Sequence, residues 1–244
     1  LALFAAVYVS QLAPRWIQTT VKPTLELMAA VPSVVVGFLA ALWLAPRLEA
    51  ALLAVLIGAV ALPFSIVLAL GVWRILPVNW RRRLPNGFEL LVLLASGAAV
   101  TVLAALVAGP IEAHFFGGDF QRFLFTEWGI RYDQRNSIVV GLVLGFAVIP
   151  VIFTIAEDAC SAVPRALVNA SRALGATRWQ TAVRLVVPAA SPGLFAAVML
   201  GLGRAVGETM IVLMAEGNTP IMEMNIFNGL RTLSANIAVE LPEA

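Results

Sequence analysis

Long apolar stretches alternate with short polar ones along the chain. Pro32, Pro63 and Pro150 fall inside three of the stretches and are expected to kink their helices. Residues 1–9 resemble the end of a further span. No stretch alternates polar and apolar residues as membrane β-strands do, so the pattern predicts an all-α integral membrane protein, a polytopic helical bundle. Each of five stretches is long enough to cross a bilayer core, which takes roughly 20 helical residues, and they cover about 24–45, 50–73, 88–109, 137–156 and 190–215.

The composition agrees with a protein that lies in lipid. Of the 244 residues, 61% are hydrophobic and 12% are charged, with a mean hydropathy of +0.93, which leaves too little polar surface to coat a soluble globule. One cysteine, Cys160, and one histidine, His114, exclude an intrachain disulfide and a His-based or Cys/His metal site. We expect no bound metal. Because Leu1 lies inside an apolar run, we also expect the chain, residues 1–244, to be part of a longer polypeptide.

The basic residues predict which loops are cytoplasmic, because Lys and Arg accumulate on that side. The segments 10–23, 74–87 and 157–189 are assigned to the cytoplasm, and 110–136 and 216–244 to the outside. Dispersed charges of this kind do not indicate nucleic-acid binding. The cytoplasmic segments hold twice as many Lys and Arg as the opposite side of the membrane, where Arg47 is counted with the two outer segments: Arg15, Lys22, Arg74, Arg81, Arg82, Arg83, Arg165, Arg172, Arg178 and Arg184, against Arg47, Arg122, Arg131, Arg135 and Arg231.

The loop at 157–188 has the signals of two short helices joined by a turn. Pro164 suits a first helical turn, Gly175 suits a left-handed position after a helix end, and Thr177 suits an N-cap. Pro188 is expected to close the second helix. The signals predict a helix–turn–helix on the membrane face.

The first of these helices admits two interpretations. Ala166, Ala170, Ala173 and Leu174 form a small apolar surface suited to a partner's groove. An amphipathic connector at the lipid headgroups would explain the same residues.

The stretch at 190–215 contains charges in an otherwise apolar sequence. Arg204 and Glu208 are four residues apart, so they can pair on one helix face, and each costs about 2.5–3.5 kcal/mol in mid-membrane. Either they form a structural pair, or Arg204 attracts an oxyanion, for which a guanidinium is well shaped. Gly203 and Gly207 have the spacing that allows close helix packing.

The chain has no nucleotide-binding loop and no signature of a membrane enzyme. Its only lysine, Lys22, lies between Val21 and Pro23, whereas a phosphate-binding loop needs Lys after Gly. The zinc motif HExxH and the nucleophile elbow are also absent. We therefore expect no catalytic residues, and pumped transport would need ATP hydrolysis on a separate subunit.

The loop resembles the motif of ABC-importer permeases, which reads Glu-Ala-Ala, three residues, Gly, nine residues, Ile, one residue, Leu-Pro. This chain has Asn169-Ala170-Ser171, Gly175 and Leu185-Val186-Val187-Pro188 at that spacing, with Asn169 in place of Glu. The resemblance implies that Asn169, Ala170, Ser171, Gly175 and Pro188 contact an ATPase subunit, which binds the ATP and Mg.

A more specific resemblance is to phosphate-specific transport permeases of the PstC type. It is carried by Gly203–Met210, Gly217–Ile221 and Asn225–Glu240. It implies import of inorganic phosphate across the bacterial inner membrane along a path that includes Arg204, Glu208 and Thr209; another oxyanion, molybdate or sulfate, is the alternative. It also implies two ATPase subunits, a second homologous permease and an extracytoplasmic phosphate-binding protein. Residues 50–136 do not fit the compact family pattern and are predicted to be an inserted pair of spans with an outer loop.

Overall fold

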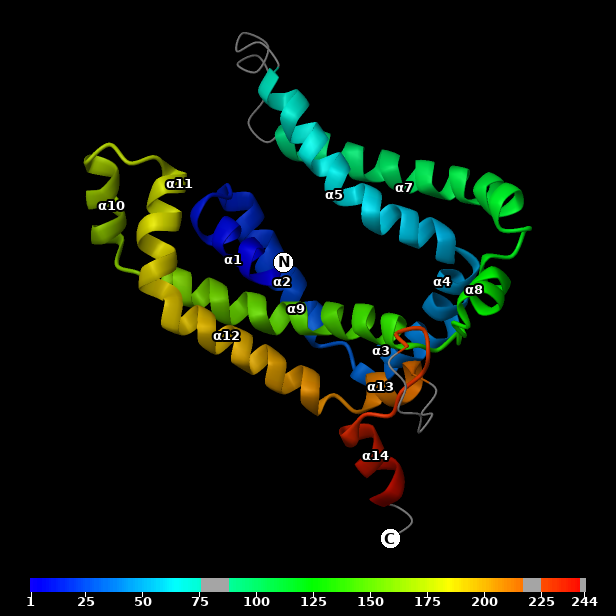
Figure 1. Ribbon diagram of the computed structural model, residues 1–244. Helices are drawn as coiled ribbons and strands as arrows, with labels where there is room; N and C mark the ends of the chain where they lie inside the picture. Colours follow the sequence, from blue (N-terminus) through cyan, green and yellow to red (C-terminus); the bar gives the residue numbers. More distant parts are fainter. Residues whose placement is uncertain (76–87, 217–224, 242–244) are drawn as a thin grey trace. The chain divides into compact units, whose positions relative to one another are not determined.

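The structure, a computed structural model, describes residues 1–75, 88–216 and 225–241, and helices make up most of them (Figure 1). No strand occurs within these ranges. This confirms the predicted all-α, multi-pass membrane architecture. Within the described ranges, five helical segments are long and apolar enough to cross a membrane: Ser33–Ala50, Leu52–Trp73, Leu91–Phe115, Ser137–Ser161 and Arg178–Gly207.

The chain divides into two compact units, described separately here. One comprises Leu1–Leu42 with Arg135–Ala244, and the other comprises Trp43–Gln134. The second unit nearly coincides with the segment 50–136. That this segment is an insertion into the family pattern stays a prediction.

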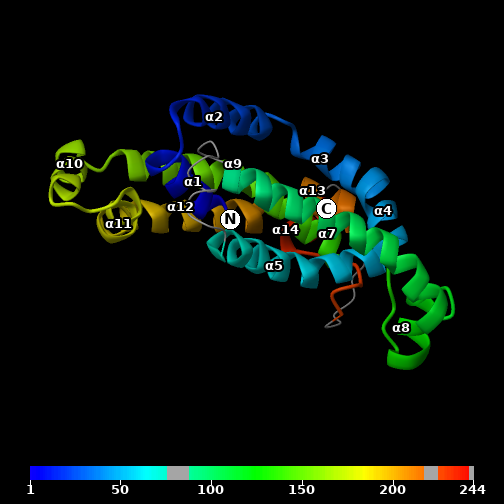
Figure 2. The same ribbon diagram turned by 90° about the horizontal axis from the view of Figure 1, so that it is seen from above.

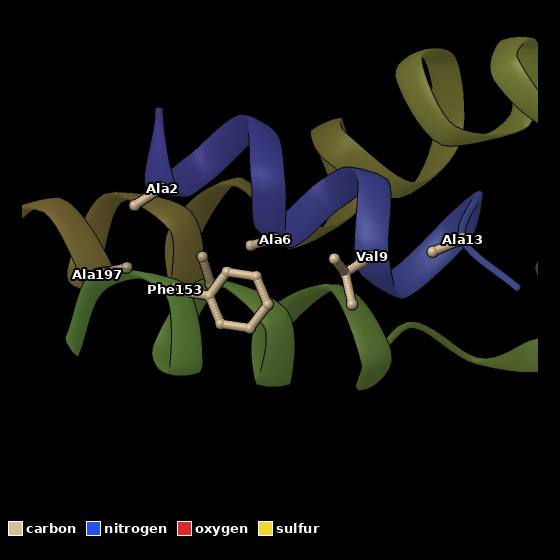
Figure 3. Close-up of a cluster of buried hydrophobic side chains, with 7 residues drawn as sticks. Ala2, Ala6, Val9, Ala13, Phe153 and Ala197 are labelled. Atoms are coloured by element: carbon tan, nitrogen blue, oxygen red, sulfur yellow. The ribbon is translucent and has the colours of Figure 1, made fainter. Parts of the chain in front are cut away.

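The first unit is built around three helices that pack through small residues. α12 (Val187–Gly207) runs along α9 (Ser137–Ser161), and α1 (Ala2–Gln11) packs on α9 as well (Figures 1 and 2). Small side chains let helix backbones approach closely in a membrane. In the buried cluster between them, one face of α1 and the residue Ala13 after it pack against Phe153 of α9 (Figure 3). The members of the cluster are Ala2, Ala6, Val9, Ala13, Phe153, Ala156 and Ala197.

The predicted span at 24–45 is displaced in the structure. Residues 24–29 belong to a separate helix, α2 (Arg15–Ala29), and the span begins only at Ser33. Pro32 explains the break, since a proline disfavours helical conformation in the residue before it and has no N–H to donate. The span then consists of α3 (Ser33–Leu39), a π-helical turn η1 (Ala40–Leu44) and α4 (Ala45–Ala50). Most of the predicted loop 10–23 is therefore helix.

The predicted span at 190–215 is also wrong as one continuous helix. α12 ends at Gly207, Glu208 is extended with ψ 120°, and a short helix α13 (Met210–Ala215) follows. Two hydrogen bonds hold the break. The Oε1 atom of Glu208 accepts from the backbone N–H of Ile211 at 3.4 Å, and the Ser234 hydroxyl, in α14 (Leu233–Glu240), donates to the Glu208 carbonyl at 3.2 Å.

The second unit contains a pair of long helices, α5 (Leu52–Ile75) and α7 (Phe88–Phe115), which pack side by side (Figure 1). A third helix, α8 (Phe120–Trp128), follows a turn at Gly117 and Gly118, both with positive φ. The Asp119 carboxylate caps α8 by accepting from the backbone N–H of Arg122 at 2.9 Å. α7 continues past the predicted end at 109. The predicted connection at Arg81–Arg83 lies outside the described residues.

Candidate functional site

The segment after α9 folds as the predicted helix–turn–helix. α10 (Arg165–Ala173) begins directly after Pro164, and α11 (Arg178–Thr181) begins after Thr177. Gly175 has φ +90°, which confirms its left-handed position. The Thr177 hydroxyl accepts from the Gln180 N–H, and the Gln180 side chain accepts from the Thr177 N–H, so a capping box starts α11.

The turn between the two helices is fixed by backbone hydrogen bonds. The N–H of Gly175 donates to the Arg172 carbonyl at 3.0 Å, and the N–H of Ala176 donates to the Ser171 carbonyl at 3.2 Å. These two bonds form a Schellman motif, which satisfies the last carbonyls of α10. A Cβ at Gly175 would meet nothing within 4 Å in the described chain. The glycine is therefore required by the backbone conformation and not by crowding within the chain.

Pro188 does not close α11, contrary to the prediction. α11 runs through a π-helical turn η2 (Ala182–Val186) into α12, and Arg178–Gly207 forms one continuous candidate span. Pro188 occupies the first turn of α12, where the regular hydrogen-bond ladder is already altered by the π-helical turn. α11 and α12 are therefore joined without a loop.

α10 has two contrasting faces and contains no buried residue. One face carries exposed small or apolar residues, including Ala170, and is continued by Leu174, which is 90% exposed. The opposite face carries Arg165, Asn169 and Arg172 at intervals of four and three residues.

The five predicted coupling residues are therefore not on one surface. Ala170 lies on the apolar face of α10 and Asn169 on the polar one. The Ser171 hydroxyl is 3.1 Å from the Thr181 hydroxyl and links α10 to α11. Gly175 forms the turn, and Pro188 belongs to α12.

Arg204 is exposed and lies three residues before the end of α12, not in the middle of a continuous span as predicted. It shares no helix face with Glu208, because the helix ends between them. Among the described residues Arg204 makes no ion pair, so the alternative of a structural pair with Glu208 is not seen there. Thr209, beside Glu208 at the break, donates its hydroxyl to the Gly207 carbonyl at 3.3 Å.

The glycines of α12 behave differently from the prediction. A Cβ at Gly203 or Gly207 would meet nothing within 4 Å, so neither packs against a helix of the described chain. Two other glycines of α12, which the sequence interpretation did not single out, do pack closely against a neighbouring helix. A Cβ at Gly193 would lie 2.5 Å from the Cβ of Ala159, and one at Gly201 would meet the side chain of Ile152. Packing of Gly203 and Gly207 against another subunit stays a prediction.

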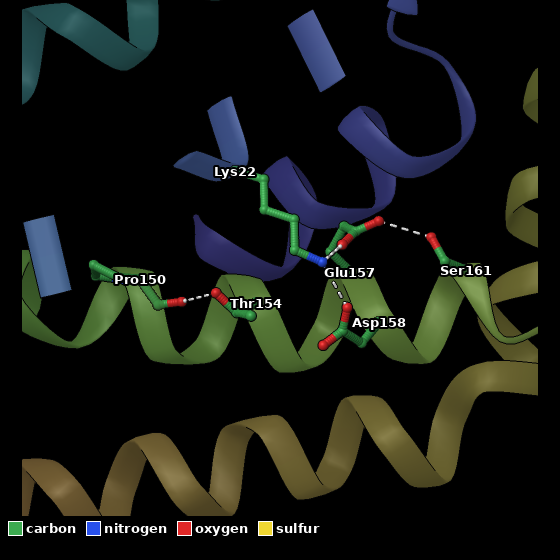
Figure 4. A network of polar contacts seen from close by, with 6 residues as sticks. All are labelled: Lys22, Pro150, Thr154, Glu157, Asp158 and Ser161. Carbon is green, nitrogen blue, oxygen red and sulfur yellow. Dashed lines mark hydrogen bonds and ion pairs between the residues drawn. The ribbon is translucent and has the colours of Figure 1, made fainter. Parts of the chain in front are cut away.

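The structure adds an ion-pair cluster that sequence interpretation missed (Figure 4). The Lys22 ammonium of α2 lies 3.0 Å from Oε2 of Glu157 and 2.8 Å from Oδ1 of Asp158, both near the end of α9. Ser161 donates to Oε1 of Glu157 at 2.7 Å. Hydrogen bonds from Lys22 to Asp158 and Glu157 raise the pKa of Lys22 above its ordinary value, against a smaller opposing effect of burial. The cluster fixes α2 to the segment that leads into α10.

Comparison with known proteins identifies the family of the chain. The family model described as binding-protein-dependent transport system inner membrane component matches residues 1–239. The chain is 27% identical over 239 residues to the phosphate transport system permease protein PstC of Haemophilus influenzae, covering 98% of this chain and 58% of that protein. It is 32% identical over 197 residues to PstC 1 of Mycobacterium tuberculosis, covering 77% of this chain and 58% of that protein.

A third relative is the probable ABC transporter permease protein YqgH of Bacillus subtilis, 32% identical over 178 residues, which covers 59% of this chain and 57% of the relative. The chain thus spans less than three fifths of the length of these relatives. No solved structure matches it at a significant level. From the family match over nearly its whole length, the chain belongs to the inner membrane components of binding-protein-dependent transport systems.

Proposed function

We propose that the chain is the permease part of an ATP-binding-cassette importer that moves inorganic phosphate into the cytoplasm. The observation that carries this proposal is the similarity, along 98% of the chain, to a protein named as a phosphate transport system permease. The chain has no ATPase motif of its own. In this proposal ATP and Mg are bound by two partner ATPase subunits, and hydrolysis there drives the movement of phosphate.

The coupling to the ATPase is assigned to α10 and the turn after it. The apolar face of α10 with Leu174 is open and made of alanines and leucines, which suits docking into a groove of a partner protein. Closure of the ATPase would move α10 and α11 as one body, because a hydrogen bond between Ser171 and Thr181 joins them. The motion then enters α12 through η2, without a loop to absorb it. Ala170, Ser171, Gly175 and Pro188 keep their assignment as coupling residues on this basis, whereas for Asn169, on the polar face of α10, the assignment is supported by the resemblance alone.

The substrate path is assigned to the far end of the same helix. Arg204 has an exposed guanidinium that no described carboxylate neutralises, and a guanidinium matches an oxyanion in shape and charge. Glu208 is engaged in holding the helix break, where Thr209 also lies. A movement of α12 relative to α13 would change how far Arg204 reaches toward phosphate.

The complex in this proposal has further members. Gly203 and Gly207 offer an uncovered face for close packing by a second, homologous permease. An extracytoplasmic phosphate-binding protein would deliver the substrate on the outer side. We assign the complex to the bacterial cytoplasmic membrane.

The test is to purify the full-length protein from its host and identify what accompanies it. We expect an ATPase and a phosphate-binding protein. The ATPase rate of the assembled transporter should rise with a phosphate-loaded binding protein and stay at its basal value with molybdate-loaded or sulfate-loaded ones. Stimulation by molybdate or sulfate instead would show that the substrate assignment is wrong, while the assignment to ABC importers would stand. The absence of any ATPase in the complex would overturn the assignment to ABC importers.

A further inference from the structure

A polar cavity of about 300 Å³ lies where α10 leaves the end of α9. Its walls come from α1, from α2, from the last turns of α9 and from α10. A volume of this size is at the lower end of those that hold small ligands or parts of larger ones. The cavity is on the opposite side of α10 from the apolar face assigned to the ATPase, so the two surfaces can be occupied together.

The α10 wall of the cavity carries hydrogen-bond donors without partners. Arg165, Asn169 and Arg172 line it together. Within the described ranges, none of these three side chains makes a hydrogen bond or an ion pair. Two guanidinium groups and an amide on one helix face provide a converging set of donors for an oxyanion.

The remaining charges of the cavity wall are already matched. Lys22 is bound to Glu157 and Asp158, and both oxygens of the Glu157 carboxylate are in use, one by Lys22 and the other by Ser161. The described structure shows no ion pair between this carboxylate and Arg165 or Arg172. With Asp158 counted beside Lys22 and Glu157, the two arginines Arg165 and Arg172 still leave the cavity and its border with a net positive charge, which favours an anion.

The position of the cavity indicates the source of the anion. It lies where the candidate span Ser137–Ser161 ends, and α2 beside it exposes Trp16. Tryptophan and the ends of spans are found at the level of the lipid headgroups. Basic pockets at that level between membrane helices bind acidic headgroups.

We propose that this cavity binds a phosphate group, supplied by the headgroup of an anionic phospholipid. Free inorganic phosphate has the same chemistry and is the other source. The bound group joins the polar face of α10 to α1 and α2, and so sets the position of α10 before the ATPase docks. This inference rests on the charge and place of the cavity and holds whichever substrate the transporter carries.

The test compares two double variants of the full-length protein in its assembled transporter without the binding protein. Arg165→Gln with Arg172→Gln removes both cavity arginines. Arg178→Gln with Arg184→Gln removes two exposed arginines of the same loop that do not line the cavity, and serves as the matched control. Thermal unfolding of both variants checks that they fold.

The first arm uses nanodiscs that contain phosphatidylglycerol in phosphatidylcholine and counts retained phosphatidylglycerol by native mass spectrometry. The second uses phosphatidylcholine alone and measures binding of radiolabelled phosphate. Because charge-assisted hydrogen bonds to a phosphate are lost, we expect the cavity variant to bind at least about tenfold more weakly than the control. A loss in the first arm assigns the site to lipid, and a loss in the second assigns it to free phosphate. Equal binding by both variants in both arms overturns the proposal. The proposed function is tested separately, by phosphate-stimulated ATPase activity, and does not depend on this result.

Discussion

The two parts of α12 differ in what surrounds them. In the first part, Gly193 and Gly201 face α9 so closely that an added Cβ would collide with it. In the last turns, Gly203 and Gly207 face open space, and Arg204 between them is exposed. One helix thus supplies both the packed core of its unit and a surface left uncovered by the part of the chain that the structure describes. The contrast separates residues that hold the fold from residues that are available to a substrate or a partner.

The largest expected effect is on transport, from Arg204→Ala. If the uncovered end of α12 meets the substrate, loss of the guanidinium should abolish phosphate uptake while membrane insertion and unfolding temperature stay unchanged. Uptake of radiolabelled phosphate by cells measures this. Arg122→Ala, which removes an exposed arginine of α8, is the control and should transport normally. Near-normal uptake by Arg204→Ala would remove Arg204 from the substrate path.

The next effect concerns stability and compares Gly193→Leu with Gly203→Leu. At Gly193 the new side chain meets the Cβ of Ala159, which cannot rotate away, so α9 and α12 must separate. Overpacking of this kind costs about 1–3 kcal/mol or more. Gly203→Leu should unfold at the wild-type temperature in detergent. If both variants unfold alike, the packed and open parts of α12 are not distinct.

The same pair of variants sharpens the assignment of the open face. We expect Gly203→Leu to fold but to lose association with the second permease, because a leucine keeps a partner helix away from the glycine backbone. Copurification from cells that express the whole complex measures this. If Gly203→Leu still copurifies with the second permease, the face of α12 that carries Gly203 and Gly207 contacts lipid and not that permease.

Substitutions at Gly175 separate backbone strain from partner contact. Gly175→Ala and Gly175→Glu place a Cβ at φ +90° and should each cost about 1–2 kcal/mol of stability. Only glutamate adds bulk and charge at the proposed ATPase contact. We expect Gly175→Glu, and not Gly175→Ala, to uncouple ATP hydrolysis from uptake or to prevent assembly. Unchanged uptake and unchanged ATPase copurification with glutamate would contradict the contact.

The smallest effect is expected for Lys22→Gln. Its side chain is 38% exposed, so the loss should be at most about 1 kcal/mol despite two carboxylate partners. Because the pKa of Lys22 is raised by these partners, their contribution is complete below the ordinary value of 10.5 and disappears only as pH rises through the higher folded value. The difference in unfolding temperature between Lys22→Gln and wild type should therefore be constant from about pH 6 to pH 9. A marked change across that range would contradict the ion-pair geometry.

Local signals in the sequence were sufficient for the α10–α11 segment. Gly175 and Thr177 act through the backbone within a few residues, and the structure has both as predicted. The count of five spans also follows from the sequence, because hydropathy sums over about twenty residues are insensitive to single positions.

The break before Ser33 comes from a local signal, Pro32, which the sequence interpretation took for a kink, but other features depend on residues far apart in the sequence. The break at Glu208 depends on Ser234, 26 residues away, and the cluster at Lys22 joins residues 135 apart. Neither leaves a periodic signal. Glu216, only 1% exposed at the end of α13, likewise has no sequence pattern that predicts its burial. Which glycines of α12 pack could not be predicted, since the spacing at Gly203 and Gly207 says nothing about whether a neighbour is present.

The central claim is that this chain takes part in ATP-driven import of phosphate. Its most direct test is accumulation of radiolabelled phosphate in proteoliposomes that contain the assembled full-length transporter and its binding protein. The account predicts accumulation that requires ATP on the side of the ATPase subunits and that excess molybdate or sulfate does not reduce. Accumulation of molybdate or sulfate in place of phosphate, or phosphate entry that is the same without ATP, would contradict it.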